Sequence, residues 1–210
     1  LLAWELDDRQ GQFRLDPRYE AFHDRFLARH PDYRIRPINP ANLARDAEHI
    51  WRISNVSLIH NWGFLPASHD VLADNFRRLK PLVDPDAIWF VEYQGRPVAF
   101  CLGYADLNEL IRPIRGRLLP LGWWKLLTGI GRIRNFRLFG LAVDPHHKGK
   151  GLDALLYVHL TRAMKPRRIR LEANWILEEN LAMNTALSRL GMQTCGRYRI
   201  YRKDLPSPSG

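Results

Sequence analysis

The chain has 210 residues, 46% of them hydrophobic and 11% aromatic, with a formal charge of +10 and a pI near 10.1. This length suits one sizeable core and is short for two. No uncharged stretch reaches membrane-spanning length and no signal peptide opens the chain, so we expect a soluble cytoplasmic protein. Two cysteines exclude a disulfide framework, and no His/Glu spacing suggests a metal site. The charge indicates an anionic partner without choosing among phosphates, nucleic acid and anionic lipid.

The N-terminal residues 1–30 are predicted to form a tether and one amphipathic helix, which Pro31 ends. The chain begins at Leu1 rather than at methionine, which indicates either a trimmed N-terminus or a domain cut from a longer polypeptide with a domain upstream.

Residues 33–104 alternate between strand-like and helical patterns. The predicted elements are, in order, a strand over 33–38, a long helix from 39, a loop over 60–66, a helix capped by Ser68, and a hairpin with strands over 87–93 and 97–104. Residues 105–134 interrupt this pattern, and we interpret them as an insertion or lid.

Regular elements return after residue 134. The predictions are a buried strand over 136–143, a helix from about 149 to 164, a strand over 168–175, a helix over 178–190, a strand over 194–203, and a disordered tail over 205–210. The alternation of strands and helices indicates a mixed α/β architecture.

The turn over 147–153 has the composition of a phosphate-binding turn. A strand, Asp144-Pro145, a basic glycine-rich turn and a helix follow one another, which directs unpaired backbone N–H groups outward at a helix N-terminus. Gly149 and Gly151 permit close approach, and Lys148 and Lys150 supply positive charge. An ordinary strand-to-helix turn explains this pattern, taken by itself, equally well.

Residues 141–152 resemble the coenzyme A-binding motif of the GNAT N-acetyltransferase superfamily. The motif's turn, Gln/Arg-x-x-Gly-x-Gly/Ala, aligns with Lys148, Gly151 and Asp153, so its first and last positions depart from the family pattern. Residues 180–192 resemble the second GNAT motif, in which an Asn, here Asn180, opens a helix. The runs over 61–64, 119–127, 171–180 and 196–201 resemble a little-described bacterial GNAT subgroup, as the C-terminal part of a two-domain chain.

The resemblance implies a GNAT domain over 31–204, with a mostly antiparallel sheet splayed between its two middle strands and helices on both faces. It also implies acetyl-CoA or another acyl-CoA as co-substrate. Its candidate cofactor-binding residues are Leu141, Ala142, Val143, Lys148, Gly149, Lys150, Gly151, Leu152, Asp153, Asn180 and Asn184.

The catalytic groups are less directly indicated. The family's thiolate acid, a tyrosine, aligns with Leu187. Period-two alternation puts Glu172 and Asn174 on one face of a covered strand, where a carboxylate needs a partner. Glu172 is therefore either a general base, with Asn174 orienting acceptor or water, or one half of an ion pair with a neighbouring Arg. Tyr198 or Tyr201 is either the proton donor to the thiolate or a core aromatic residue.

The acceptor candidates lie in two loops. They are Asn61, Trp62, Asp106 and Asn108, which the alternative interpretation makes helix caps and core anchors. The segment 111–134 interleaves cations with tryptophans and leucines; we favour a lid or a domain interface over a contact with a membrane surface.

These features predict an acyl-CoA-dependent N-acyltransferase, in the first instance an acetyltransferase, that acts by direct transfer on a small-molecule amine without a metal. One alternative is a catalytically inactive GNAT-like module that binds acyl-CoA, and another is an acyltransferase acting on a nucleic-acid or protein partner. Nucleic acid is not favoured, because no nucleic-acid-binding motif is present and much of the basic charge lies where coenzyme A phosphates would bind.

Overall fold

The computed structural model describes residues 1–59, 61, 63–66, 68, 74, 78, 80–115, 117, 119 and 122–203. The strands are β1 Leu2–Asp7, β2 Tyr33–Pro37, β3 Ile88–Tyr93, β4 Arg96–Ala105, β5 Asn135–Val143, β6 Arg170–Ile176 and β7 Gln193–Arg197. The helices are α1 Pro17–Arg29, α2 Leu43–Ser57, α4 Asn108–Ile111, α5 Gly122–Gly129, α6 Leu152–Met164 and α7 Leu181–Arg189. Single 3₁₀ turns lie at Pro40–Asn42, Lys80–Leu82, Pro85–Ala87, Ile130–Arg132, Pro145–His147 and Lys165–Arg167.

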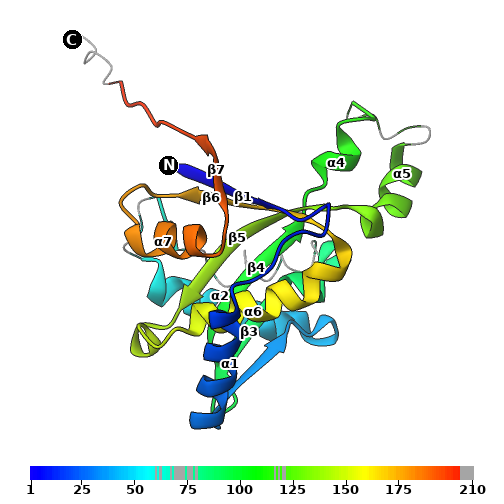
Figure 1. Cartoon of the computed structure of the whole chain (residues 1–210). Helices are drawn as coiled ribbons and strands as arrows, with labels where there is room; N and C mark the ends of the chain where they lie inside the picture. The colour runs from blue at the N-terminus through cyan, green and yellow to red at the C-terminus, as the bar shows by residue number, and fades with distance from the viewer. Residues whose placement is uncertain are drawn as a thin grey trace, which may run out of the picture.

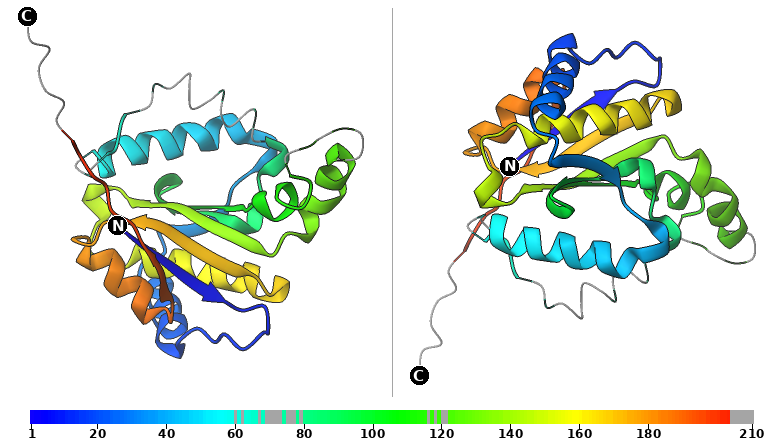
Figure 2. Two further views of the ribbon diagram at one scale, coloured as in Figure 1. Left: turned by 90° about the horizontal axis from the view of Figure 1, so that it is seen from above. Right: turned by 90° about the horizontal axis from the view of Figure 1, so that it is seen from below.

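The strands form one sheet of seven in the order β2-β3-β4-β5-β6-β1-β7. All neighbouring pairs are antiparallel except β5 and β6, which are parallel. Helix α2 covers one face of the sheet, and α1, α6 and α7 lie on the other (Figure 2). The predicted mostly antiparallel sheet with helices on both faces is confirmed.

The two middle strands separate part of the way along their length. Strand β5 pairs with β6 only from Asn135–Arg170 to Leu138–Ala173. Beyond Leu138, β5 continues to pair with β4 as far as Val143, so its β6-facing edge has no strand beside it. The predicted splay is thus confirmed, and it begins at Leu138 and Ala173.

The N-terminal tether differs from its prediction, because Leu2–Asp7 form strand β1 in the sheet between β6 and β7 (Figure 1). Ala3 is buried, and the indole Nε1 of Trp4 donates to Oδ1 of Asn184 at 3.0 Å. The predicted closing strand over 194–203 is shorter than expected: β7 ends at Arg197. A short strand with one tryptophan and two carboxylates has no local signal for a position inside a sheet; long-range pairing decides it.

Helix α6 lies at the centre of the core beneath the sheet. Its apolar side chains include Leu152, Leu155, Leu156 and Val158, all at most 1% exposed, because the helix packs against the sheet on one side and α1 on the other. The main buried charge on the α2 face, Asp46, accepts two hydrogen bonds from Arg36 and one from the backbone N–H of Asn39. These three bonds compensate its desolvation.

The predicted insertion contains two short helices. Helices α4 and α5 stand away from the sheet beside each other (Figure 1), and the Leu110 side chain packs where a Cβ on Gly129 would lie. Trp123 and Trp124 on α5 are 46% and 57% exposed.

The predicted helix after Ser68, Trp62 and the tail over 205–210 lie outside the described residues, apart from isolated positions such as Asp74 and Arg78. Within the part of the chain that the structure describes, no helix has the length and apolar character needed to cross a membrane.

A pair of histidines joins α1 to α6, and we expect it to make the free energy of unfolding depend on pH. His23 Nε2 lies 3.0 Å from His159 Nε2, and Trp89 packs on the His159 ring. Burial, followed by the nearby His23, lowers the pKa of His159 from 6.5 to about 4.

Because the folded state resists protonation of His159, its contribution to stability is complete above pH 6.5. That contribution is lost as the pH falls towards 4. Between pH 7 and pH 4.5, the free energy of unfolding should fall by on the order of 1–2 kcal/mol less in His159→Gln than in the wild type, after a discount for the partial exposure of His159. Urea unfolding of both proteins at the two pH values measures this. Equal losses in the two proteins would contradict the assignment.

Candidate functional site

The turn before α6 presents an uncapped helix N-terminus. Asp144 caps the preceding 3₁₀ turn by accepting from the His146 N–H. Gly149 and Gly151 have φ values of +76° and +78°, and Gly151 is the N-cap residue of α6. Among the described residues, no side chain caps the first turn of α6. The Ala154 N–H donates to the Gly151 carbonyl at 3.1 Å. The other N–H groups at the start of α6 and the positive end of the helix dipole suit an anion, and anion binding there stays a prediction.

The two lysines of the turn differ in their surroundings. Lys150 Nζ donates to the Tyr33 hydroxyl at 3.2 Å, and that hydroxyl lies 2.7 Å from His147 Nδ1. A lysine ammonium only donates, so the Tyr33 O–H can itself donate to His147 when Nδ1 of that ring carries no proton. Burial and the Lys150 charge lower the pKa of His147, which favours the neutral ring that this bond requires. Both lysines are exposed, but Lys150 braces the turn through its bond to Tyr33.

An open groove of about 630 Å³ begins at this turn. Its walls come from α1, the first turn of α6 and α7, and include Gly151, Asp153, Thr185 and the cations Arg18 and Arg189. A volume of this size accommodates a nucleotide-sized ligand. The predicted cofactor residues Gly151 and Asp153 therefore line a groove, with Lys148, Gly149, Lys150 and Leu152 in the same turn or at the start of the same helix.

The other predicted donor-site residues lie beyond the turn. Leu141, Ala142 and Val143 occupy the splayed part of β5, where the β6-facing edge is unpaired. Asn180 caps α7, its Oδ1 accepting from the Met183 N–H at 3.1 Å. Asn184 donates to the carbonyls of Leu177 and Glu178 and accepts from Trp4, so its amide fixes β1 and the loop before α7. Contacts of these residues with a cofactor stay predictions.

A polar cluster lies on the α2 side of the sheet, at the paired end of β5 and β6. Arg137 Nε donates to Asp106 Oδ2 at 3.0 Å, and its Nη1 lies 4.0 Å from Glu172 Oε1. Asn174 Nδ2 donates to the same Glu172 oxygen at 2.8 Å, and Asn108 donates to Asp106. The structure thereby brings together two predicted catalytic residues, Glu172 and Asn174, and two predicted acceptor residues, Asp106 and Asn108.

Arg137 is the residue that the sequence analysis did not name. It is the register partner of Glu172 across β5 and β6 and of Tyr104 across β4 and β5. The available signal was the alternation Phe136, Arg137, Leu138, in which a charged residue interrupts a buried apolar strand. Asp106 and Glu172, whose side chains are 16% and 17% exposed, both face this guanidinium.

The remaining candidates are placed elsewhere. Tyr198 packs edge-on against Trp175 with ring centroids 6.1 Å apart, and no described contact joins it to Glu172. Asn61 lies in the turn after α2, where its N–H donates to the Leu58 carbonyl. Leu187, aligned with the family's tyrosine, is fully buried on α7. Among the described residues, no group of three or more His, Cys, Asp or Glu side chains is arranged to hold a metal ion.

The splayed sheet, with helices on both faces, defines the class of fold to which this α/β protein belongs. No family model matches the chain. It is similar to an N-acetyltransferase from Staphylococcus aureus Mu50, with 20% identity, a TM-score of 0.55 and coverage of 78% of this chain and 85% of that one. It is also similar to a GCN5-related N-acetyltransferase from Sphaerobacter thermophilus, with 12% identity, a TM-score of 0.57 and coverage of 92% and 47%. The chain therefore has the GNAT fold.

Two curated proteins also match in sequence. Protein YghO of Escherichia coli K12 is 33% identical over 178 residues, and the bacterial ceramide synthase of Caulobacter vibrioides is 25% identical over 178 residues. Each match covers 81% of this chain and 46% of the relative. The chain thus spans about half the length of the curated relatives it matches.

The two glycines of the turn differ in what a side chain would meet. A Cβ on Gly149 has open space, whereas a Cβ on Gly151 would lie 2.6 Å from Phe22 Cζ on α1. We expect Gly149→Ala to cost about 1 kcal/mol, for its left-handed backbone alone, and Gly151→Ala about 2–3 kcal/mol. Urea unfolding measures both. The added loss in Gly151→Ala should shrink in a Phe22→Ala background; an unchanged loss there would refute the contact as its cause.

Proposed function

We propose that this chain is an acyl-CoA-dependent N-acyltransferase. The observation that carries the proposal is the relation of two features along one pair of strands. An uncapped, glycine-rich helix N-terminus follows the splayed end of β5, and the Glu172 cluster lies at the paired end. An extended acyl-CoA with its phosphates at the N-terminus of α6 would place its thioester beside the Glu172 cluster.

The residues present fit an acyl-CoA. The N–H groups of the turn suit its pyrophosphate, and the adjoining groove, with Arg18 and Arg189, suits its phosphorylated nucleoside. The unpaired edge of Leu141 to Val143 offers backbone groups to the amides of pantetheine. Acetyl-CoA is the simplest donor of this class.

The cluster supplies a proton acceptor for the nucleophile. The amine nitrogen attacks the thioester carbonyl carbon, and the Glu172 carboxylate takes the proton that the nitrogen loses, directly or through water. The tetrahedral oxyanion then collapses, the C–S bond breaks, and the departing thiolate takes the proton that Glu172 accepted, directly or through water. Asn174 and Arg137 orient Glu172, so Arg137 and Asn174 act as positioning residues in this scheme.

Replacement of Glu172 tests this role. Glu172→Gln should lower kcat by on the order of 10²–10⁴ while acyl-CoA binding changes little. Thiol release from acetyl-CoA with a panel of amines measures kcat, and calorimetry measures binding. Glu179→Gln, at an exposed carboxyl in the loop before α7, is the matched control and should keep wild-type turnover.

Three results would oppose the proposal in different ways. Unchanged turnover in Glu172→Gln would remove Glu172 as the base. Binding of acyl-CoA without turnover of any amine would favour an inactive binding module. Salt-dependent affinity for tRNA or DNA that coenzyme A does not affect would favour a nucleic-acid partner.

A long-chain amine is the second candidate for the acceptor, beside a small polar amine. Tyr104 and Phe139 lie beside the cluster with ring centroids 6.1 Å apart, and they are 39% and 66% exposed. One relative is named a ceramide synthase, and ceramides are amides of long-chain amino alcohols. An exposed aromatic pair next to the proton acceptor suits an amine that carries an apolar chain.

This acceptor class predicts a selective effect of the aromatic pair. Phe139→Ala should raise KM for a long-chain amino alcohol about tenfold, because apolar contact area is lost, and leave KM for ethanolamine within about twofold. Steady-state assays with both amines measure the ratio. Equal changes for the two amines would exclude a chain contact at Phe139.

A further inference from the structure

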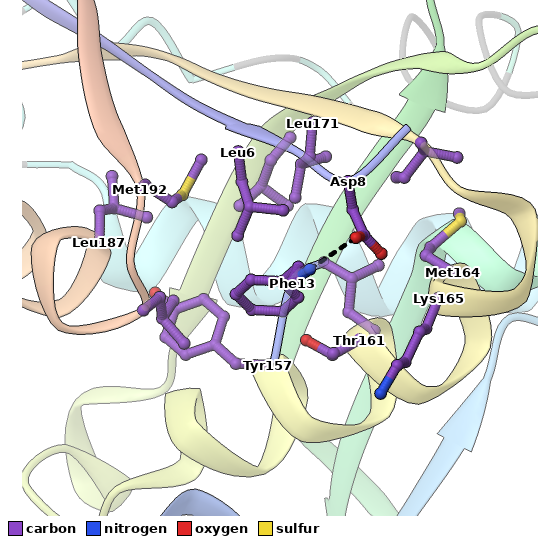
Figure 3. A pocket seen from close by; sticks show the side chains of 14 residues that line it. Leu6, Asp8, Phe13, Tyr157, Thr161, Met164, Lys165, Leu171, Leu187 and Met192 are labelled. Carbon is purple, nitrogen blue, oxygen red and sulfur yellow. Dashed lines mark hydrogen bonds between the residues drawn. The ribbon is translucent and has the colours of Figure 1, made fainter. Parts of the chain in front are cut away.

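An apolar cavity of about 60 Å³ lies beneath the sheet, on the face opposite Glu172 (Figure 3). Leu138 of β5 and Leu171 of β6 line it from the sheet and form its roof. Tyr157 and Met164 come from α6, and Leu187 and Met192 close the α7 side. Its few polar groups lie to one side: Asp8, which accepts from the Phe13 N–H at 2.8 Å, with Thr161 and Lys165.

The cavity adjoins the point where β5 and β6 part. Leu138 is the last β5 residue paired with β6, and Leu171 lies two residues before its partner Ala173. Strand alternation puts Leu138 and Leu171 on one face and Arg137 and Glu172 on the other. The cavity and the carboxylate cluster therefore flank the same junction, one below the sheet and one above it.

An acyl-CoA bound along the unpaired edge of β5 would reach this junction. A pantetheine arm running from the α6 turn past Val143 and Leu141 would bring its thioester to Leu138. A hydrocarbon chain continuing in the same direction would meet the cavity roof.

We infer that this cavity receives the hydrocarbon end of the donor's acyl group, so that the chain uses a medium-length acyl-CoA in preference to acetyl-CoA. The inference rests on the proposed function, because it concerns the same donor. The lining is almost free of polar atoms, so water is a poor occupant and a hydrocarbon a good one. Tyr157 uses its hydroxyl on Met183 Sδ, at 3.6 Å, and contributes its ring.

The cavity volume limits the chain length. About 60 Å³ holds roughly four to six groups of the size of a water molecule, which is close to that of a methylene. Each buried methylene is expected to tighten binding about fourfold until the space is full. Affinity should therefore rise from acetyl-CoA to hexanoyl-CoA and then stop rising.

The first experiment compares CoA, acetyl-, butyryl-, hexanoyl- and palmitoyl-CoA by calorimetry. Leu187→Phe should move the affinity maximum to a shorter chain, and Leu187→Ala to a longer one. Leu187→Met, of similar volume, is the matched control and should keep the wild-type maximum. Melting curves for each variant show whether it is folded.

The second experiment needs no variant, because the chain has only 3 methionines. Met164 and Met192 line the cavity and Met183 does not. With [¹³C-methyl]methionine, hexanoyl-CoA should shift the Met164 and Met192 signals beyond any shift that CoA alone produces. The difference between the two ligands should be small at Met183.

The outcomes separate this inference from the proposed function. If CoA binds and acetyl transfer occurs, but hexanoyl-CoA binds no tighter and gives no extra shift at Met164 and Met192, the cavity assignment is overturned and the function stands. If neither CoA nor any acyl-CoA binds, the proposed function fails and the cavity assignment fails with it. Extra affinity for hexanoyl-CoA that Leu187→Phe abolishes supports both.

Discussion

The parting of β5 and β6 after Leu138 and Ala173 is the constraint on which the rest of the site depends. Two parallel strands that stay paired leave no backbone groups free and no space between them. Because these two diverge, the far half of β5 keeps an unpaired edge that leads back to the α6 turn. The junction itself then lies between a polar cluster above the sheet and an apolar cavity below it.

Successive side chains of a strand point to opposite faces of the sheet, and this alternation decides which residues face the polar cluster and which face the cavity. Arg137 and Glu172 share one face, and Leu138 and Leu171 share the other. The four residues come from two strands that are neighbours in the sheet but are separated in the chain by α6. The Arg137 guanidinium faces both Glu172 and Asp106, so the ion-pair interpretation of Glu172 and its interpretation as a base are compatible. A partnered carboxylate can remain half-buried at a site open to solvent and still accept a proton.

The N-terminal strand has an unexpected part in building this arrangement. Strand β1 separates β6 from β7, places Leu6 in the cavity wall and ties α7 to the sheet through the Trp4 and Asn184 contact. Helix α1, which follows, forms one wall of the groove beside Gly151. Residues 1–30 are therefore integral to the fold and to both proposed ligand-binding regions.

The sequence by itself determined the local features: the apolar strand into Asp144, the glycines that need a positive φ, the Asn180 cap and the alternation of Glu172 with Leu171. Each depends on residues close together in the chain, where periodicity and turn chemistry act. Only the tertiary structure decided the place of β1, the end of β7 at Arg197, the contacts of Arg137 with Asp106 and Glu172, and the cavity at Leu187. These depend on contacts between residues far apart in sequence, such as Trp4 with Asn184, which carry no local signal because pairing and packing are settled by the whole sheet.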